Sequence, residues 1–279
     1  MYKIIIDSCG ELTPEMKADG HFVNVPLTLE IDNNQIVDDE TFDQASFIKA
    51  VAESPNAPKS ACPSPNAYMQ EMDCDAENIY LVTLSAQLSG SYNSACLAKD
   101  LFEEDDEANK NVHVFDSKSA SIGETLIGLK IAECENAGMS FSQVIETVDA
   151  YIAEQHTFFV LETLETFRKS GRLSNLKATI AETLNIKPVM GSTEIGYVQQ
   201  LAKGRGMVQA IDKMTKCVMD VTTNCENKIL AISHCNCPER ALSLKKKMES
   251  LANFKDIFIV DMRGVSTMYA SDGGVILVV

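Results

Sequence analysis

Residues 79–95 read IYLVTLSAQLSGSYNSA, and this stretch decides the fold. The continuous apolar run over 79–84 is typical of a strand covered on both faces, as in a parallel sheet between helices. A Ser/Gly-rich loop follows, and a helix is predicted over 89–102. Ligands of such sheets bind beyond the carboxyl ends of the strands. Hydroxyls and backbone N–H groups at a helix N-terminus suit a carboxylate or a phosphate, and Gly90 lets a ligand approach the backbone. Such caps also occur without a ligand.

The same alternation of strand and helix extends along the rest of the chain. Further strands are predicted at 2–6, 22–30, 112–115, 157–161, 186–190, 228–233, 256–260 and 274–279. Further helices are predicted at 43–53, 65–72, 121–138, 141–154, 174–184, 205–221 and 237–252. Ser140 and Gln143 predict a capping box at the start of one of these helices. The alternation indicates an α/β fold, and we expect two α/β domains with mostly parallel sheets, residues 1–156 and 157–279.

The charges divide the chain at the same place. Residues 1–156 carry 8 lysines, no arginine and 28 acids, whereas residues 157–279 carry 16 basic residues and 12 acids. The net charge of −16 over 279 residues offers no basic footprint for a nucleic acid. No apolar run approaches the ~20 residues of a membrane span, and the first apolar run is too short for a signal peptide. We therefore expect a cytoplasmic protein that has no integral membrane segment and binds no nucleic acid.

The nine cysteines suggest reduced thiols, because their number is odd and no export signal is present. The segment His234-Cys235-Asn236-Cys237, with Cys225 upstream, is a candidate metal site. Its spacing matches no standard pair of C-x-x-C knuckles, and placement between a strand and a helix explains it more simply. We expect no metal.

Motifs of common catalytic machinery are absent. The chain has no G-x-S-x-G elbow, no phosphate-binding P-loop and no H-E-x-x-H pair. The Gly204-Arg-Gly206 segment lacks the third glycine of a dinucleotide-binding loop. These absences favour a binding protein that has no catalytic residue and no cofactor over an enzyme.

Three further segments carry polar groups at predicted element ends. Asp7-Ser8-Cys9-Gly10 follows the first strand, and Ser60-Ala61-Cys62-Pro63-Ser64-Pro65 forms a rigid loop before a helix. The third segment is basic, with Arg168-Lys169-Ser170-Gly171-Arg172 followed much later by Lys203-Gly204-Arg205. Arginine is well suited to bidentate recognition of carboxylate or phosphate. The alternative for the first segment is an ordinary helix cap, and for the basic one a solvated surface.

In this order, the segments resemble the DegV family of bacterial fatty-acid-binding proteins over nearly the whole chain. The matching motifs lie in register and are Asp7-Ser8, Ser60-Ala61-Cys62-Pro63-Ser64, Leu88-Ser89-Gly90-Ser91-Tyr92, Phe115-Asp116-Ser117, Lys169-Ser170-Gly171-Arg172-Leu173-Ser174, Leu184-Asn185-Ile186-Lys187-Pro188-Val189 and Lys203-Gly204-Arg205.

The resemblance implies two α/β domains with one long-chain fatty acid in an apolar tunnel between them. It implies that Ser60 and Ser89 hold the carboxylate, with Gly90 and Ser91 in the same motif. It also implies that Arg172 and Arg205 lie around the head group and the docking site of a separate fatty-acid kinase subunit. That kinase makes an acyl phosphate for phospholipid synthesis. Each buried methylene is worth roughly 0.8 kcal/mol, so the tunnel would supply the affinity and the hydroxyls would satisfy the carboxylate.

The chain departs from the family pattern in two places. Ala270 stands where the family has a histidine, and Asp272-Gly273-Gly274 replaces its last turn, which places an acid near an anionic head group. Ser60, Ala61 and Cys62 replace Thr, Ser and Gln of the first hydroxyl motif. The missing histidine leaves two alternatives open: a module that senses a lipid without kinase transfer, and an enzyme that acts on a small anionic substrate.

Overall fold

The computed structural model describes residues 1–104, 110–173 and 185–279, and its first sheet is parallel throughout. Its strand order is β2 (Phe22–Val25), β1 (Tyr2–Asp7), β6 (Asn78–Thr83) and β7 (Asn111–Asp116). Alternate residues of these apolar strands face opposite sides. Ile4 and Ile6 pack under the helices α5 (Ile122–Asn136) and α6 (Phe141–Glu154). Ile5 packs on the other face, against α3 (Pro65–Met72) and α4 (Ser91–Glu103).

A small antiparallel sheet lies beside the first one, with strand order β4 (Asn34–Val37), β3 (Thr28–Ile31) and β5 (Lys59–Ala61). The single strand predicted at 22–30 is therefore wrong, because β2 and β3 belong to different sheets. Pro26 lies at the break, and a proline cannot donate a ladder hydrogen bond. The helix α2 (Gln44–Glu53) connects β4 to β5. The sequence analysis missed β4 and β5, which are short and largely polar.

The third sheet has six strands and holds the C-terminal part of the chain. Its order is β10 (Val198–Arg205), β9 (Ile186–Ser192), β8 (Thr157–Val160), β13 (Val275–Val278), β11 (Ile229–His234) and β12 (Asp256–Asp261). The α/β class is confirmed, but mostly parallel pairing holds only for the first sheet, since here only β11 and β12 are parallel. The β9–β10 turn is too short for the crossover that parallel strands need. The polar edge strand β10 was not predicted.

The long helices match their predicted positions within two residues at each end. They include α8 (Gly206–Val221) and α9 (Pro238–Leu251), which pack on one face of the six-stranded sheet. The capping box of Ser140 and Gln143 is confirmed. Three short helices were missed: α1 (Pro14–Asp19), α7 (Glu165–Lys169) and α10 (Gly264–Ala270). The helix predicted at 174–184 lies outside the described residues.

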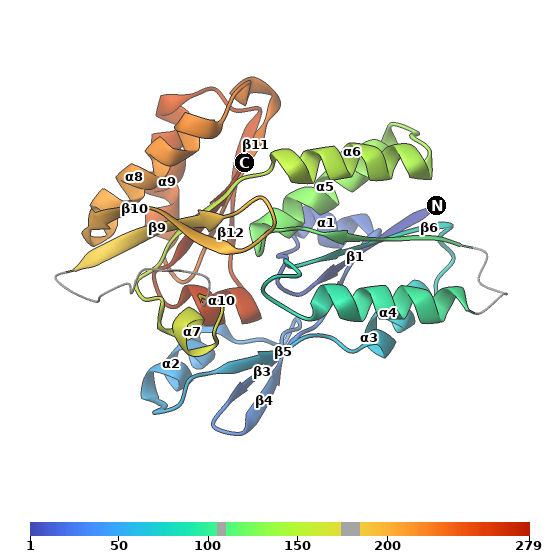
Figure 1. Cartoon of the computed structure of the whole chain (residues 1–279), viewed down its shortest axis with the longest axis horizontal. Coiled ribbons are helices and arrows are strands. Elements are labelled where there is room, and N and C mark those ends of the chain that lie inside the picture. The colour runs from blue at the N-terminus through green and yellow to red at the C-terminus, as the bar shows by residue number, and fades with distance from the viewer. Residues whose placement is uncertain (105–109, 174–184) are drawn as a thin grey trace.

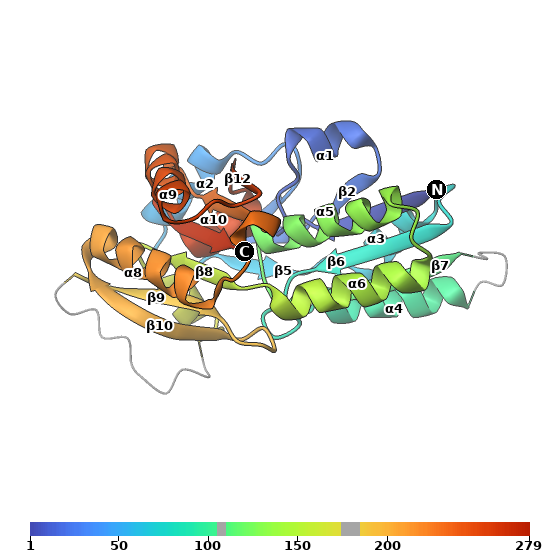
Figure 2. The same cartoon turned by 90° about the horizontal axis from the view of Figure 1, so that it is seen from above.

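Helix α5 joins the two large sheets, because it packs on the first sheet and also contacts β11 and β13. Figures 1 and 2 show the six-stranded sheet with α8 and α9 at one end of the molecule and the parallel sheet at the other. The helices α7, α10 and α2 lie between the six-stranded and the small sheet (Figure 1). A domain boundary at residue 156 stays a prediction. No helix in the described ranges is long and apolar enough to cross a membrane, and all nine cysteines are free thiols.

Candidate ligand-binding cavity

A cavity of about 320 Å³ lies where the two large sheets, α10 and the small sheet meet. This volume is at the lower end of the range for small-molecule sites. Most of its wall is apolar and comes from segments far apart in the chain. The apolar lining residues are Leu27, Leu84, Leu88, Ala120, Phe159, Leu161, Phe167, Val198, Val265, Tyr269, Ala270 and Ile276. Phe167 contacts both Phe159 and Tyr269, with ring centroids 5.7 Å and 4.8 Å apart.

One end of the cavity reaches the surface, and we call its residues Ser60, Ser89, Gly90 and Arg172 the mouth. The sequence analysis predicted all four as site residues, and the fold brings them to one cavity. Ser60 lies on β5, and Ser89 and Gly90 precede α4, in the loop after β6. Gly90 is the N-cap of α4 and has no side chain to cap this thirteen-residue helix. Of the first backbone N–H groups of the helix, that of Ser91 donates to the Ser89 hydroxyl.

The Ser89 hydroxyl is held at the mouth by its neighbours. Its Oγ lies 3.2 Å from Ser91 Oγ and accepts a 3.2 Å hydrogen bond from the Ser91 backbone N–H. Ser91 itself is fully buried and is not among the cavity-lining residues. Ser91, which the sequence analysis grouped with Ser89 and Gly90 as a carboxylate-binding residue, therefore does not line the cavity and contacts Ser89 instead.

Arg172 is fixed at the mouth by two backbone carbonyls. Its Nε donates to the Leu88 carbonyl at 3.1 Å and its Nη1 donates to the Ser170 carbonyl at 2.8 Å. Within the described ranges it forms no salt bridge with a carboxylate. A guanidinium has five N–H donors, so donors remain for an anion at the mouth.

Arg205, the other predicted arginine, lies elsewhere. It is exposed at the end of β10 and does not line the cavity. Ala270, at the expected histidine position, is buried in the cavity wall. Asp272 is exposed, accepts a 2.9 Å hydrogen bond from Asn236 Nδ2, and does not line the cavity. The turn therefore does not bring Asp272 into the cavity wall.

A buried part of the wall contains Cys9, Ser121 and Ser266, which we call the inner wall. Ser266 Oγ donates to the Cys9 carbonyl at 3.0 Å, which ties α10 to the loop after β1. Ser121 Oγ donates to Glu11 Oε2 at 2.8 Å and lies 2.9 Å from Ser233 Oγ. The hydroxyls of the inner wall are thus engaged with the protein.

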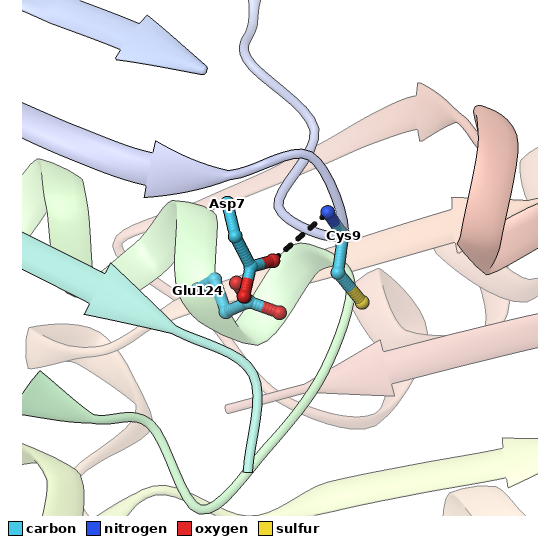
Figure 3. A group of neighbouring side chains, drawn as sticks. All are labelled: Asp7, Cys9 and Glu124. Carbon is cyan, nitrogen blue, oxygen red and sulfur yellow. Dashed lines mark hydrogen bonds between the residues drawn. The ribbon is translucent and has the colours of Figure 1, made fainter. Parts of the chain in front are cut away.

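Buried acids lie directly behind the inner wall. Asp7 and Glu124 meet beside Cys9 (Figure 3), and all three side chains are 3% exposed or less. Both oxygens of Glu124 lack a hydrogen-bond partner within the described residues. Burial raises the pKa of Asp7 and raises that of Glu124 well above its usual value. It also raises the pKa of Glu11 to about 8. We call Asp7, Glu11 and Glu124 the acid cluster.

Burial disfavours the ionised forms of the acid cluster, because ionising several buried carboxyls side by side is costly. The ligand atoms of Asp7, Cys9 and Glu124 lie within 4.8 Å of one another, close enough to share a cation. The Asp7 oxygens already accept hydrogen bonds from the backbone N–H groups of Cys9 and Leu84, at 3.1 Å and 3.0 Å. Elsewhere in the described chain the ligand atoms of no three such residues converge, those of His234, Cys235 and Cys237 included.

Asp38 fixes the helix that forms one side of the cavity, a role the sequence analysis did not find. Its Oδ2 accepts hydrogen bonds from Ser8 Oγ and from the Val265 backbone N–H of α10, both at 2.9 Å. The Asp38 carboxylate fills the place that a side chain at Gly264 would occupy, 1.7 Å from an added Cβ. Only glycine is compatible with this contact. The pattern of strands and helices did not predict the contact between Asp38 and Gly264, because these two residues are 226 positions apart in the sequence.

The comparisons with known proteins match this architecture along the whole chain. Residues 1–279 match the family model described as "Uncharacterised protein, DegV family". A DegV domain-containing protein of Streptococcus pneumoniae is 32% identical over 282 residues, which span 99% of this chain and 98% of the relative.

Solved structures of relatives superpose closely. A DegV family protein from Ruminococcus gnavus, refined with vaccenic acid, is 54% identical, with a TM-score of 0.96 over 100% of this chain and 99% of the other. The Fatty Acid Kinase (Fak) B3 protein of Streptococcus pneumoniae, loaded with linoleic acid, is 32% identical, with a TM-score of 0.88 over 100% and 98%. A protein from Eubacterium eligens loaded with heptadecanoic acid is 26% identical, with a TM-score of 0.90 over 100% and 99%. This chain belongs to the DegV family.

Proposed function

We propose that the chain binds one long-chain fatty acid, with the acyl chain in the cavity and the carboxylate at the mouth. The observation that carries the proposal is the polarity of the cavity. Its wall is mainly apolar, and Ser89 and Arg172 provide donors for an anion at the mouth. The vaccenic, linoleic and heptadecanoic acids of the three relatives support the same ligand class.

The orientation of the acid follows from the electrostatics. A carboxylate at the mouth meets the hydroxyls of Ser60 and Ser89 and the positive charge of Arg172. A carboxylate at the inner wall would lie next to the acid cluster, where burial already disfavours negative charge. The acyl chain is suited to the interior, since each buried methylene contributes roughly 0.8 kcal/mol.

The chain presents the bound carboxylate to a separate fatty-acid kinase, which transfers phosphate to it for phospholipid synthesis. The likeness to the Fatty Acid Kinase (Fak) B3 protein supports this role. The mouth is partly open, and Arg205 is exposed and free for a partner surface. In this role the chain is a cytoplasmic carrier that needs neither catalytic residue nor cofactor.

Ala270 favours a second candidate, a lipid sensor that does not pass its ligand on. The family pattern has a histidine where this chain has a buried alanine in the cavity wall, so a polar group beside the ligand that could assist transfer by a kinase would be missing. An enzyme acting on a small anionic substrate is less well supported, because the cavity is mostly apolar.

The two candidates are separated by adding a fatty-acid kinase and ATP to the protein loaded with radiolabelled acid. A carrier yields acyl phosphate, which hydroxylamine traps as a hydroxamate. A sensor binds the acid equally well and yields none. Ala270→His is the informative variant, because a gain of turnover in it assigns the missing contact to this position.

A further inference from the structure

The cavity wall is thin on the side formed by Ser119 and Thr157. Both residues line the cavity, and both also line a second hollow of about 400 Å³ on the far side. Lys118 and Ser192 are shared between the two hollows in the same way. The two spaces are therefore separated here by the thickness of single residues.

A side-chain hydrogen bond closes this wall. Ser119 Oγ and Thr157 Oγ1 lie 2.6 Å apart, and the two residues are only 4% and 8% exposed. Ser119 belongs to the loop after β7, whereas Thr157 is the first residue of β8. The pair thus bridges the N-terminal and C-terminal sheets at this point.

The neighbouring part of the wall contains no side chain. Gly191 lines the cavity, and an added Cβ there would lie 2.7 Å from Leu201 Cδ1 and 2.8 Å from the Thr157 carbonyl. Leu201 in turn lines the second hollow. The backbone of Gly191 and the Ser119–Thr157 pair therefore lie between the two spaces, together with Lys118 and Ser192.

We propose that the Ser119–Thr157 pair limits the length of the acyl chain, and that opening it lets a longer chain extend into the second hollow. This inference rests on the proposed fatty-acid function. The second hollow has a mixed lining, with polar and charged side chains such as Glu194 and Asp220 beside the apolar ones. The end of an acyl chain would contact its apolar part, which is formed by Ile152, Phe158, Leu201 and Val221. Ser119 and Thr157 satisfy each other, so an apolar chain end beside them leaves no buried polar group without a partner.

The test compares Thr157→Ala with Thr157→Val. Alanine removes both the hydroxyl and a methyl group, whereas valine keeps the volume and removes only the hydrogen bond. Each protein is stripped of lipid and offered an equimolar series of saturated fatty acids that extends beyond the longest acid bound by the wild type. Native mass spectrometry gives the occupancy by each acid, and thermal unfolding confirms the fold. If Thr157→Ala does not fold, Ser119→Ala is tested in its place, because it removes the other hydroxyl of the pair.

We expect Thr157→Ala to raise binding of acids two methylenes longer, relative to the wild-type optimum, by about tenfold. We expect Thr157→Val to keep the wild-type length profile. If both Thr157→Ala and Thr157→Val prefer longer acids than the wild type, the pair still limits the chain length. The hydrogen bond, and not the side-chain volume, is then what keeps the wall closed. An unchanged profile in folded Thr157→Ala and Ser119→Ala overturns the inference. Failure of the proposed function is a separate result, since the wild type would then bind no acid of any length.

Discussion

The mouth and the inner wall of the cavity are both polar, but their chemistry is opposite. At the mouth, Ser89, Arg172 and the first turn of α4 offer donors to an anion. At the inner wall, Ser121 and Ser266 are turned to protein acceptors, and Glu11 lies behind them with its pKa raised to about 8. The mouth can take up negative charge, whereas the inner wall disfavours it.

This difference shows how a cavity of mixed lining orients an amphipathic ligand. Orientation needs donors at one end and a penalty for charge at the other, since apolar contact alone would allow both directions.

The largest effect is expected from a negative charge at the mouth. Ser89→Asp places a carboxylate beside that of the ligand, and like charges in contact cost several kcal/mol. We expect fatty-acid affinity to fall by on the order of a hundredfold or more in an isothermal titration. Aspartate is favourable near a helix N-terminus, so the fold should persist. Ser89→Asn is the matched neutral control, and an equal loss in both variants would contradict the electrostatic account.

The acid cluster predicts an unusual dependence of stability on pH. The pKa of Glu11 rises from 4.5 to about 8 on folding, so the folded chain keeps a proton that the unfolded chain releases. The free energy of unfolding therefore falls as the pH rises from 4.5 to about 8, and this one group contributes a decrease on the order of a few kcal/mol.

Glu11→Gln should remove the decrease in stability that comes from Glu11, because a neutral side chain does not titrate. The free energy of unfolding, measured in urea from pH 6 to pH 9, should fall less steeply with pH in the variant. Asp7, Asp38 and Glu124, whose pKa values burial also raises, are present in both proteins, so the difference between the two slopes belongs to Glu11. Equal slopes in both proteins would mean that Glu11 is not protonated in the folded state.

A smaller decrease in fatty-acid affinity is expected when the mouth loses one hydrogen-bond donor without gaining a charge. Ser89→Ala should weaken fatty-acid binding by about 1–3 kcal/mol, since a charged acceptor loses a hydrogen bond. Ser142→Ala, at an exposed serine of α6, is the matched control and should bind as the wild type does. Unchanged affinity in Ser89→Ala would remove this hydroxyl from the site.

The two arginines should differ, because only Arg172 lines the cavity. Arg172→Ala should weaken binding by about 0.5–1.5 kcal/mol, because it removes donors and frees the Leu88 carbonyl. Arg205→Ala should leave the affinity unchanged and lower only the kinase-dependent formation of acyl phosphate. Lipid affinity is read from a titration, and kinase turnover from hydroxamate trapping. Equal effects of both variants on affinity would contradict their different placement.

The sequence was sufficient to predict those features that depend on local patterns, namely most strands, the helix starts and the residues of the motifs. Apolar runs of four to six residues marked most strands of the large sheets, and caps such as Ser140 marked helix starts. Ser60, Ser89, Gly90 and Arg172 were found because they stand at element ends in motif order.

The rest depends on contacts between distant residues. Nothing near Asp38 indicates that it holds the start of α10, and nothing near Glu11 indicates that Ser121 covers it. The direction of strand pairing in the six-stranded sheet was also missed, because β8, β13 and β11 are neighbours in space but not in sequence. The sequence also did not show that Asp272 lies outside the cavity wall, since a turn can direct a side chain either way.

Native and then denaturing mass spectrometry of the freshly purified protein tests the central claim most directly. We predict one adduct per chain with the mass of a long-chain fatty acid, retained under native conditions and released on denaturation. A mass equal to that of the chain alone, unchanged after incubation with fatty acids, would contradict the account.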